Sequence, residues 1–394
     1  MNSAPRQSRV AATYMRGGTS KGVFFLAGDL PPAGPVRDAV LLRVIGSPDP
    51  YGKQIDGMGA ATSSTSKVVV VAPGSRAGCD VDYWFGQVAI DRARVDWSGN
   101  CGNLSAAVGP FAIAKGLVAA PRDGVATVRI WQANISKVIV AQVPMQAGEV
   151  QELGDFTMDG VTFPAAEIVL TFLDPGAQAD TGGGMFPTGR ALDVLDVPGV
   201  GQIEATLIDA GNPAVFVDAA ALGLRGTESQ HEVNGDAALL ARLEAVRAHG
   251  AVAMGAARSV EEASTLRQHT PKLAFFALPA AYVAAGGRAV GAEEIDIVAR
   301  IMSMGQLHHA MTGTGAVGIA AAAAVPGTIL SRMLGGPRAG LCFGHASGCL
   351  RVGARAALSC GRWGVTEVTM SRSARRLMEG VVFVPEGAFD SQPG

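Results

Sequence analysis

Two segments built almost entirely of small residues constrain the fold of this chain more than any other feature. Residues 103–117 have the sequence NLSAAVGPFAIAKGL, and residues 315–325 have the sequence GAVGIAAAAAV. Both have helical composition, but alanine and glycine cannot form a broad contact face at a protein surface. The sequence therefore predicts two central, closely packed helices, one in each half of the chain.

The residues at the start of these segments share a pattern. CGNLSAAV, residues 101–108, and TGTGAVGI, residues 312–319, each begin with a small side chain that carries a proton, followed by glycine and a polar residue. Internal similarity of this kind indicates a pseudo-duplicated architecture. Two helix N-termini would then face each other across a cleft between domains, and their unpaired N–H groups and partial positive charge favour carboxylates.

The length of the chain also favours two domains, because 394 residues exceed the ~250 to 300 at which one hydrophobic core stops growing. A segment rich in glycine and proline, residues 173–189, is the expected linker. We therefore expect domains at residues 1–185 and 186–394. β-Branched and aromatic runs predict strands at residues 67–72, 126–143, 203–210, 214–217 and 272–278. Apolar residues at helical spacing predict further helices at residues 36–46, 236–252 and 293–304.

The distribution of charge is more informative than its total. A net charge of -2 and a pI near 6.3 give no indication of a nucleic-acid partner or a membrane surface. Acidic residues are absent from four segments, residues 1–28, 57–79, 97–122 and 297–366, and the last of these contains six arginines and three histidines. Two interpretations stand: the segments converge on a positive pocket for an anionic small molecule, or they are simply buried.

The five cysteines show neither paired spacing nor C-x-x-C, so neither a disulfide framework nor a zinc site is predicted. His308 and His309 are adjacent in sequence and no third ligand is evident, so we expect no metal. The first residues lack the apolar core of a signal peptide, and no run approaches the ~18 apolar residues that span a bilayer. A reducing cytoplasm is the expected location.

Two segments match nucleotide-binding motifs only superficially. GTGAVG, residues 313–318, fits G-x-G-x-x-G, but the preceding residues 302–312 show no strand pattern, and no acid occurs before Glu367. GSPDPYGKQ, residues 46–54, has one residue too many before its Gly-Lys and carries Gln54 where a hydroxyl should hold magnesium. Neither segment supports nucleotide binding.

Three places carry candidate chemistry. MRGGTSKG, residues 15–22, is either a plain turn between strands or a carboxylate cradle of N–H groups, with Arg16, Ser20 and Lys21 beside them. Lys67 joins a polar loop to an apolar strand, so it is either a solvated charge at a strand edge or a desolvated base. Cys101 is either core packing or a thiolate at a helix start, and the glycines and asparagines around it favour the second.

The longer motifs together resemble the PrpF family of methylaconitate isomerases. They are MRGGTSKGVFF, GSPDPYGKQIDGMGAATSSTSKVV, DWSGNCGNLSAAVGPFAI, WQANISKVIVAQVP, GGGMFPTGR, DAGNPAVFV and FGHASGCLRVG, and the likeness runs nearly end to end. Ala60 and Ser136 stand where glycine would be expected. The resemblance implies a diaminopimelate epimerase-like α/β fold (α+β), in which two pseudo-symmetric domains each curl a mixed sheet around a central helix. It also implies an active site in the cleft between the domains.

By the same resemblance, Cys101 matches the first cysteine of the epimerases, and Thr312 stands in the place of the second. Threonine is a poor proton-transfer residue, so a two-cysteine racemisation is not expected. The family implies instead a cofactor-independent cis/trans or allylic isomerisation of an unsaturated tricarboxylate, with Lys67 and Cys101 as the proton-transfer pair. The expected substrate-binding residues are Arg16, Ser20, Lys21, Ser64, Thr65, Ser66, Asn100, Gly102, Asn103, Thr312, Gly313 and Thr314.

The expected reaction is the conversion of a methylaconitate isomer to 2-methyl-cis-aconitate in the 2-methylcitrate route of propionate breakdown. Alternatives are a 4-oxalomesaconate tautomerase, a methylitaconate-type isomerase, and a non-enzymatic accessory of an aconitase-like dehydratase. The resemblance further implies a homodimer and a functional link to that dehydratase.

Overall fold

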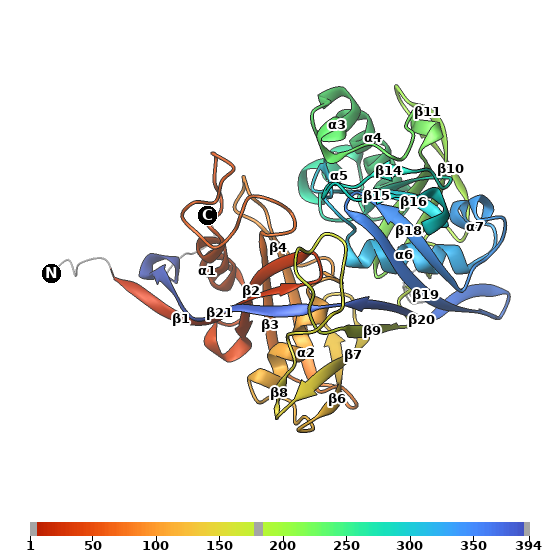
Figure 1. Cartoon of the computed structure of the whole chain (residues 1–394). Helices are drawn as coiled ribbons and strands as arrows, with labels where there is room; N and C mark the ends of the chain where they lie inside the picture. The colour runs from red at the N-terminus through yellow and green to blue at the C-terminus, as the bar shows by residue number, and fades with distance from the viewer. Residues whose placement is uncertain (1–5, 177–183, 390–394) are drawn as a thin grey trace. The chain divides into compact units, whose positions relative to one another are not determined.

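A computed structural model describes residues 6–176 and 184–389 of the chain (Figure 1). Packing divides these residues into two compact units. Unit 1 contains residues 6–156, 164–169 and 372–389, and unit 2 contains residues 157–163, 170–176 and 184–371. The predicted domain boundary between residues 185 and 186 stays a prediction. Part of the predicted linker, residues 177–183, lies outside the described residues.

Unit 1 begins with an antiparallel hairpin of β1 (Gln7–Gly17) and β2 (Ser20–Leu26). Helix α1 (Pro35–Ile45) then leads to β3 (Lys67–Pro73), which runs parallel to β2. Strand β4 (Val81–Val88) returns antiparallel to β3 and is followed by the short β5 (Val95–Asp96). This arrangement puts the first residue of β3 opposite the end of β4.

Helix α2 (Ser105–Ala114) follows and packs against strands of unit 1 on several sides. Strand β6 (Gly124–Gln132) is parallel to β4, and β7 (Lys137–Gln146) is antiparallel to β6. The remaining strands are β8 (Glu149–Val150), β9 (Ile168–Leu173), which ends in unit 2, and β21 (Ala374–Pro385), which pairs with β1.

Unit 2 repeats this order of connections. Strands β10 (Asp193–Val197), β11 (Gly201–Ala210) and β12 (Asn212–Asp218) form an antiparallel meander. Helices α3 (Gln230–Asn234), α4 (Ala237–Ala253) and α5 (Val260–Leu266) lead to β13 (Lys272–Ala277), parallel to β12. Strand β16 (Ile297–Ser303) is antiparallel to β13 and is followed by β17 (Gln306–Leu307). A separate small hairpin contains β14 (Tyr282–Val283) and β15 (Ala289–Val290).

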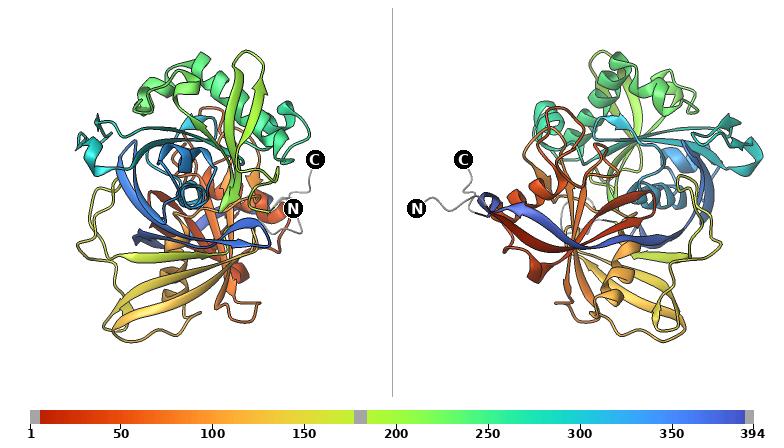
Figure 2. Two further views of the ribbon diagram at one scale, coloured as in Figure 1. Left: turned by 90° about the vertical axis from the view of Figure 1, so that its right-hand side faces the viewer. Right: turned by 60° about the vertical axis from the view of Figure 1, so that its left-hand side comes forward.

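Helix α6 (Gly313–Ala324) comes next and is enclosed by strands of unit 2 (Figure 2). After α7 (Ile329–Met333), strand β18 (Gly340–His345) runs parallel to β16. Strands β19 (Gly348–Ser359) and β20 (Arg362–Arg372) complete the sheet in antiparallel order.

The two units therefore share one topology: a hairpin, a helical crossover to a parallel strand, an antiparallel return, a buried helix, and a strand parallel to that return. Every residue of α6 and the stretch from Ser105 to Ala112 in α2 are buried. Small side chains make this burial possible, because they let the backbone of each helix approach the surrounding strands closely. The predicted central helices and the predicted fold class are confirmed.

Most of the other predicted elements are confirmed as well, but the helix predicted at residues 293–304 is wrong. This segment contains a short 3-10 helix, Ala292–Glu294, followed by β16, whose residues are all buried. A strand covered on both faces loses its alternating pattern, and a short apolar run then has the same appearance as a buried helix. The segment 302–312, expected to hold no strand, includes the end of β16 and all of β17.

Across residues 6–176 and 184–389, none of the helices combines the length and apolar character that crossing a membrane requires.

Candidate active site

Lys67 is the first residue of β3 and is deeply buried, with 6% of its surface exposed. Its Nζ donates a hydrogen bond of 2.6 Å to Oε1 of Gln87, the residue opposite it in β4. Nζ also lies 4.9 Å from the centre of the Phe85 ring. Burial lowers the pKa of Lys67, and negative charge on Cys101 acts in the opposite direction. Burial thus favours the neutral amine of Lys67, and its role in proton transfer stays a prediction.

Cys101 lies in the turn that leads into α2 and is also 6% exposed. Its carbonyl oxygen accepts a hydrogen bond from Ser105 N at 2.9 Å, so the helical hydrogen-bond pattern already begins at this residue. Leu104 N lies 3.5 Å from Cys101 Sγ and donates to it. An N–H group at a helix N-terminus stabilises negative charge on the sulfur.

Residues around this turn fix its backbone. The Tyr83 hydroxyl, whose pKa burial raises well above its ordinary value, donates to Cys101 O at 3.5 Å. Ser105 Oγ donates to Asn100 Oδ1 at 3.4 Å and to Cys101 O at 3.0 Å. Asn100, Gly102 and Asn103, three of the predicted binding residues, are all buried within this turn.

Arg372 is a buried cation of the same site that the sequence analysis missed. It is 2% exposed, and its Nε donates to Asn103 Oδ1 at 3.0 Å. Burial lowers the pKa of Arg372 to about 10, while negative charge on Cys101 opposes that shift. Lys67 and Arg372 therefore both interact electrostatically with Cys101, and both gain from a negative charge there.

The glycines of the β1–β2 turn let this hairpin approach the Cys101 turn. Asn103 Nδ2 donates to Thr19 Oγ1 at 3.0 Å. A Cβ atom on Gly17 would lie 2.7 Å from Asn103 O, and one on Gly18 would lie 2.5 Å from Asn103 Oδ1. Gly18 also has a φ of 51°, in the left-handed region. The two glycines are therefore required by the close approach as well as by the turn.

We expect Gly18→Ala to destabilise the protein by about 1–3 kcal/mol, because the methyl group combines a positive φ with displacement of Asn103. Urea unfolding would measure this loss. Gly28→Ala is a suitable control, because a Cβ there meets no atom within 4 Å, and its unfolding free energy should change by less than about 0.5 kcal/mol. Equal effects of the two substitutions would contradict this account.

Strand register separates the predicted residues of the β1–β2 hairpin. Gly17 pairs with Ser20 and faces α2, whereas Arg16 pairs with Lys21 on the opposite face. Arg16 Nη1 donates to Gly18 O at 3.1 Å and to Ser373 O at 3.0 Å, and burial lowers its pKa. Lys21 Nζ lies 5.3 Å from the centre of the Tyr14 ring. Ser20 thus shares the face of Cys101, while Arg16 and Lys21 lie across the hairpin, and their binding roles stay predictions.

The loop before Lys67 is held in place by Gln54, which stands where a phosphate-binding loop would have a hydroxyl side chain. Gln54 Oε1 accepts from Ser66 Oγ at 2.8 Å and from Ala61 N at 2.8 Å. Thr65 Oγ1 lies 2.9 Å from Thr62 Oγ1, and Ser64 O accepts from Lys21 N at 3.0 Å. Ser64, Thr65 and Ser66 therefore hold the entry to β3 in place, and contact between them and a substrate stays a prediction.

The predicted residues Thr312, Gly313 and Thr314 lie at the start of α6 in unit 2. Thr312 is the N-cap, with Oγ1 accepting from Gly315 N at 3.1 Å, and Thr314 Oγ1 accepts from Asn212 Nδ2 at 3.3 Å. Where unit 1 has a thiol, unit 2 thus has a capping hydroxyl, and the binding role of Thr312 stays a prediction.

Unit 2 also has a counterpart of Lys67 that the sequence analysis missed. Lys272 is the first residue of β13 and is buried, as Lys67 is in β3. Its Nζ donates to His269 O at 3.1 Å and to Ser303 Oγ, at the end of β16, at 3.2 Å. Aligning the two halves strand by strand would have revealed this lysine, because Lys67 and Lys272 are each the first residue of the strand that follows the helical crossover.

Within the described ranges 6–176 and 184–389, no three His, Cys, Asp or Glu side chains are grouped so that they could hold a metal ion. The candidate site in unit 1 brings together the amine of Lys67, the thiol of Cys101 and the guanidinium of Arg372.

This duplicated fold, with a cysteine at the start of one central helix and a threonine at the start of the other, defines a class of protein: the α/β proteins with the diaminopimelate epimerase-like fold. Within this class, the chain belongs to the PrpF protein family, whose model matches residues 7–385.

Two proteins and one solved structure are similar to this chain over nearly its whole length. It is 59% identical to the 2-methyl-aconitate isomerase of Shewanella oneidensis, over 97% of this chain and 98% of that protein. It is 58% identical to the 2-methyl-aconitate isomerase of Cupriavidus necator, over 97% and 99%. The crystal structure of a methylitaconate-delta-isomerase is similar with a TM-score of 0.76 at 37% identity, covering 98% of each chain. The predictions of the PrpF family and of an isomerase are confirmed.

Proposed function

We propose that this protein is a cofactor-independent isomerase that converts 2-methyl-trans-aconitate, or an allylic isomer of it, to 2-methyl-cis-aconitate. The observation that carries the proposal is the buried amine of Lys67, which interacts electrostatically with Cys101. The names of the two relatives at 58% and 59% identity support the choice of substrate.

In the proposed reaction, one proton leaves a carbon that is both allylic and next to a carboxylate. Lys67 is the proposed base, because burial lowers its pKa and so increases the neutral fraction of the amine at a given pH. The electron pair of the broken C–H bond spreads over the double bond and the carboxylate. The former double bond then has single-bond character, which permits rotation, and a returning proton completes the isomerisation. Cys101 is the proposed partner of Lys67 in these proton transfers.

The site contains groups that stabilise the negative charge of such an intermediate. Arg372 remains a cation at neutral pH with a pKa of about 10, and the Cys101 turn offers N–H groups at the start of α2. The other binding residues expected from the sequence, on the hairpin, in the loop before Lys67 and at the start of α6, are proposed to hold the carboxylates.

Proton exchange by the isolated protein tests this function. In deuterated water, we expect 2-methyl-trans-aconitate to acquire deuterium at its allylic carbon and to form the cis isomer, both followed by proton NMR. Comparison of kcat/KM with 4-oxalomesaconate and 3-methylitaconate would determine the preferred substrate. If neither exchange nor isomerisation occurs with any of these compounds, catalysis is refuted and the accessory function is favoured.

The proposed setting follows from the same reaction. We propose that the protein acts in the cytoplasm, in the 2-methylcitrate route of propionate breakdown, as a homodimer. Its product would be the substrate of an aconitase-like dehydratase, the proposed functional partner. Light scattering of the purified protein would measure the oligomeric state, and a monomer would contradict that part of the proposal.

A further inference from the structure

A pair of cysteines lies outside the proposed active site, on the β18–β19 hairpin of unit 2. Cys342 pairs with Arg351 across the hairpin, and Gly344 pairs with Cys349. The cysteines are thus diagonal neighbours two residues apart in register, and their side chains lie on the same face of the sheet. Cys349 packs against the apolar cluster to which the buried Cys342 belongs. The two cysteines therefore lie near each other on one face of the hairpin.

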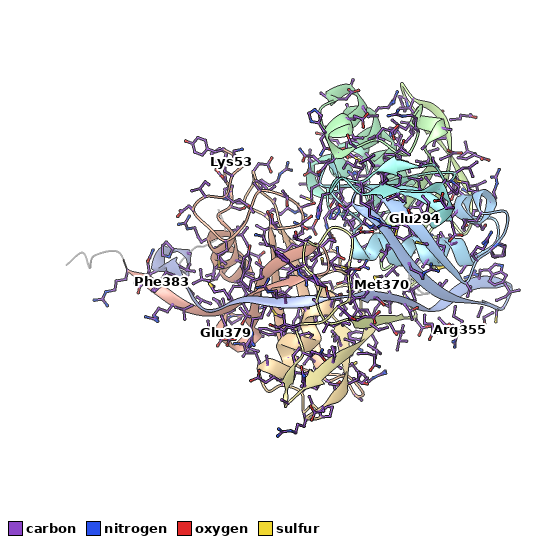
Figure 3. The ribbon with its side chains drawn as sticks, in the orientation of Figure 1. Lys53, Glu294, Arg355, Met370, Glu379 and Phe383 are labelled. Carbon is purple, nitrogen blue, oxygen red and sulfur yellow. The ribbon has the colours of Figure 1, made fainter. Side chains whose placement is uncertain are left out.

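An arginine is held against one of these sulfurs. Nη1 of Arg288 lies 3.8 Å from Cys349 Sγ and donates to it. The same guanidinium forms ion pairs with Asp159 at 2.6 Å and with Glu294, labelled in Figure 3, at 2.5 Å. Asp159 also accepts from Cys349 N at 2.7 Å. These carboxylates fix the position of the arginine, so its charge stays beside the sulfur.

The environment gives the two thiols different properties. The hydrogen bond from Cys342 and the charge of Arg288 lower the pKa of Cys349 to about 6, against the opposing effects of burial and of Asp159. The pKa of Cys342 is raised, because its proton forms that hydrogen bond and because it is buried beside Asp296, with Arg351 in opposition. Tyr282 is the other titratable group that interacts with Cys349. The thiolate form of Cys349 is therefore stabilised, while that of Cys342 is disfavoured.

The solvent exposure of the two cysteines agrees with the difference between their thiols. Cys349 is partly exposed and can meet a small reagent, whereas Cys342 is buried with 8% of its surface accessible. Cys79 offers a comparison within the same chain, because it is also partly exposed but burial raises its pKa. A reactive cysteine needs both access and a stabilised thiolate, and only Cys349 of these three combines them.

We propose that Cys342 and Cys349 form a dithiol modification site, which hydrogen peroxide oxidises to a disulfide between strands β18 and β19. In the first step, the Cys349 thiolate attacks one peroxide oxygen, the O–O bond breaks, and a sulfenic acid forms while the leaving hydroxide takes up a proton to give water. In the second step, the sulfur of Cys342 attacks the sulfenic sulfur, the S–O bond breaks, and the thiol proton of Cys342 passes to the departing hydroxide, which leaves as a second water. The two sulfurs lose two electrons, and the peroxide gains them.

Mass spectrometry of the full-length protein tests this proposal. After treatment with equimolar hydrogen peroxide, we expect the loss of two hydrogens from the intact mass, a linked Cys342–Cys349 peptide, and reversal by dithiothreitol. Cys349→Ser should abolish this loss of two hydrogens, whereas Cys79→Ser should leave it unchanged. Cys342→Ser should stop the reaction at a sulfenic acid on Cys349, which dimedone traps. Oxidation confined to other cysteines, or an unchanged two-hydrogen mass loss in Cys349→Ser, would overturn the proposal.

The pH dependence of alkylation provides a second test that does not require disulfide formation. A pKa near 6 increases the thiolate fraction at pH 6 but also lowers the nucleophilicity of the thiolate. We therefore expect Cys349 to react with iodoacetamide about tenfold faster at pH 6 than a cysteine peptide of ordinary pKa, and more slowly than that peptide at pH 8. Arg288→Gln should reduce this advantage at pH 6. Equal rates in the wild type and Arg288→Gln would refute the role of the arginine.

Discussion

Replacing Lys67 with methionine is expected to lower kcat for methylaconitate isomerisation by about 10³-fold, within the range for loss of a general base. Methionine has a similar length and no amine, so it removes the proton-transfer group while filling the same space beside Phe85 and Gln87. Because the substitution also removes a buried charge, the protein should remain folded. Initial rates and circular dichroism of the purified variant would test both statements.

A matched control is available on the surface. Lys53 is exposed and labelled in Figure 3, and Lys53→Met makes the same chemical change on a side chain in solvent. Its kcat should stay within about twofold of the wild type, because surface substitutions remote from a site have small effects. A Lys67→Met protein that retains wild-type turnover would remove Lys67 from the mechanism.

The lowered pKa of Lys67 also predicts that the stability of the wild type depends on pH, and Lys67→Met provides the comparison. Burial holds the pKa of Lys67 in the folded protein below its ordinary value of 10.5, which applies to the unfolded chain. Below the folded pKa both states bind the proton, so folding must bury a charge. As the pH rises through the window up to 10.5, the folded protein releases its proton first, and the cost of burial disappears. Wild-type stability should therefore rise relative to Lys67→Met between pH 7 and pH 10. Urea unfolding would measure this difference in stability. A difference that stays constant from pH 7 to pH 10 would contradict the lowered pKa.

The main outline of the fold was predictable because it depends on local composition. Alanine and glycine leave α2 and α6 no position except the interior of each unit, and the run from Lys67 has the apolar character of a buried strand. Lys67 and Cys101 were also predictable as a pair, but through resemblance rather than through physical reasoning on the residues. Taken alone, each residue also had a structural interpretation, a solvated charge at a strand edge for Lys67 and core packing for Cys101.

The rest of the candidate site depends on contacts between distant parts of the chain. Arg372 reaches Asn103 from the other end of the sequence, and no local pattern connects them. Strand register, which the sequence does not display, places Arg16 and Ser20 on opposite faces of one hairpin. The error at β16 has a related cause, since burial on both faces removes the periodicity that distinguishes a strand from a helix.

Replacing Cys101 with alanine is expected to reduce isomerisation by about 10³-fold as well, because it removes the second proton-transfer group. The structure adds an electrostatic consequence. Negative charge on Cys101 opposes the lowering of the Lys67 pKa by burial, so its loss lets that pKa fall further. The acidic limb of the pH profile for residual proton exchange, which reports protonation of Lys67, should therefore move to lower pH. Steady-state rates and deuterium exchange measured across pH would show both effects.

These measurements also assign the order of proton transfer. If Lys67 takes the first proton, Cys101→Ala should still exchange the allylic hydrogen of the substrate while isomer formation is lost. If Cys101 takes it, exchange and isomerisation should be lost together. Cys79→Ala, which removes a thiol outside the site, should retain both activities. Wild-type isomerisation by Cys101→Ala would show that the thiol transfers no proton, leaving Lys67 as the one residue that removes and returns it.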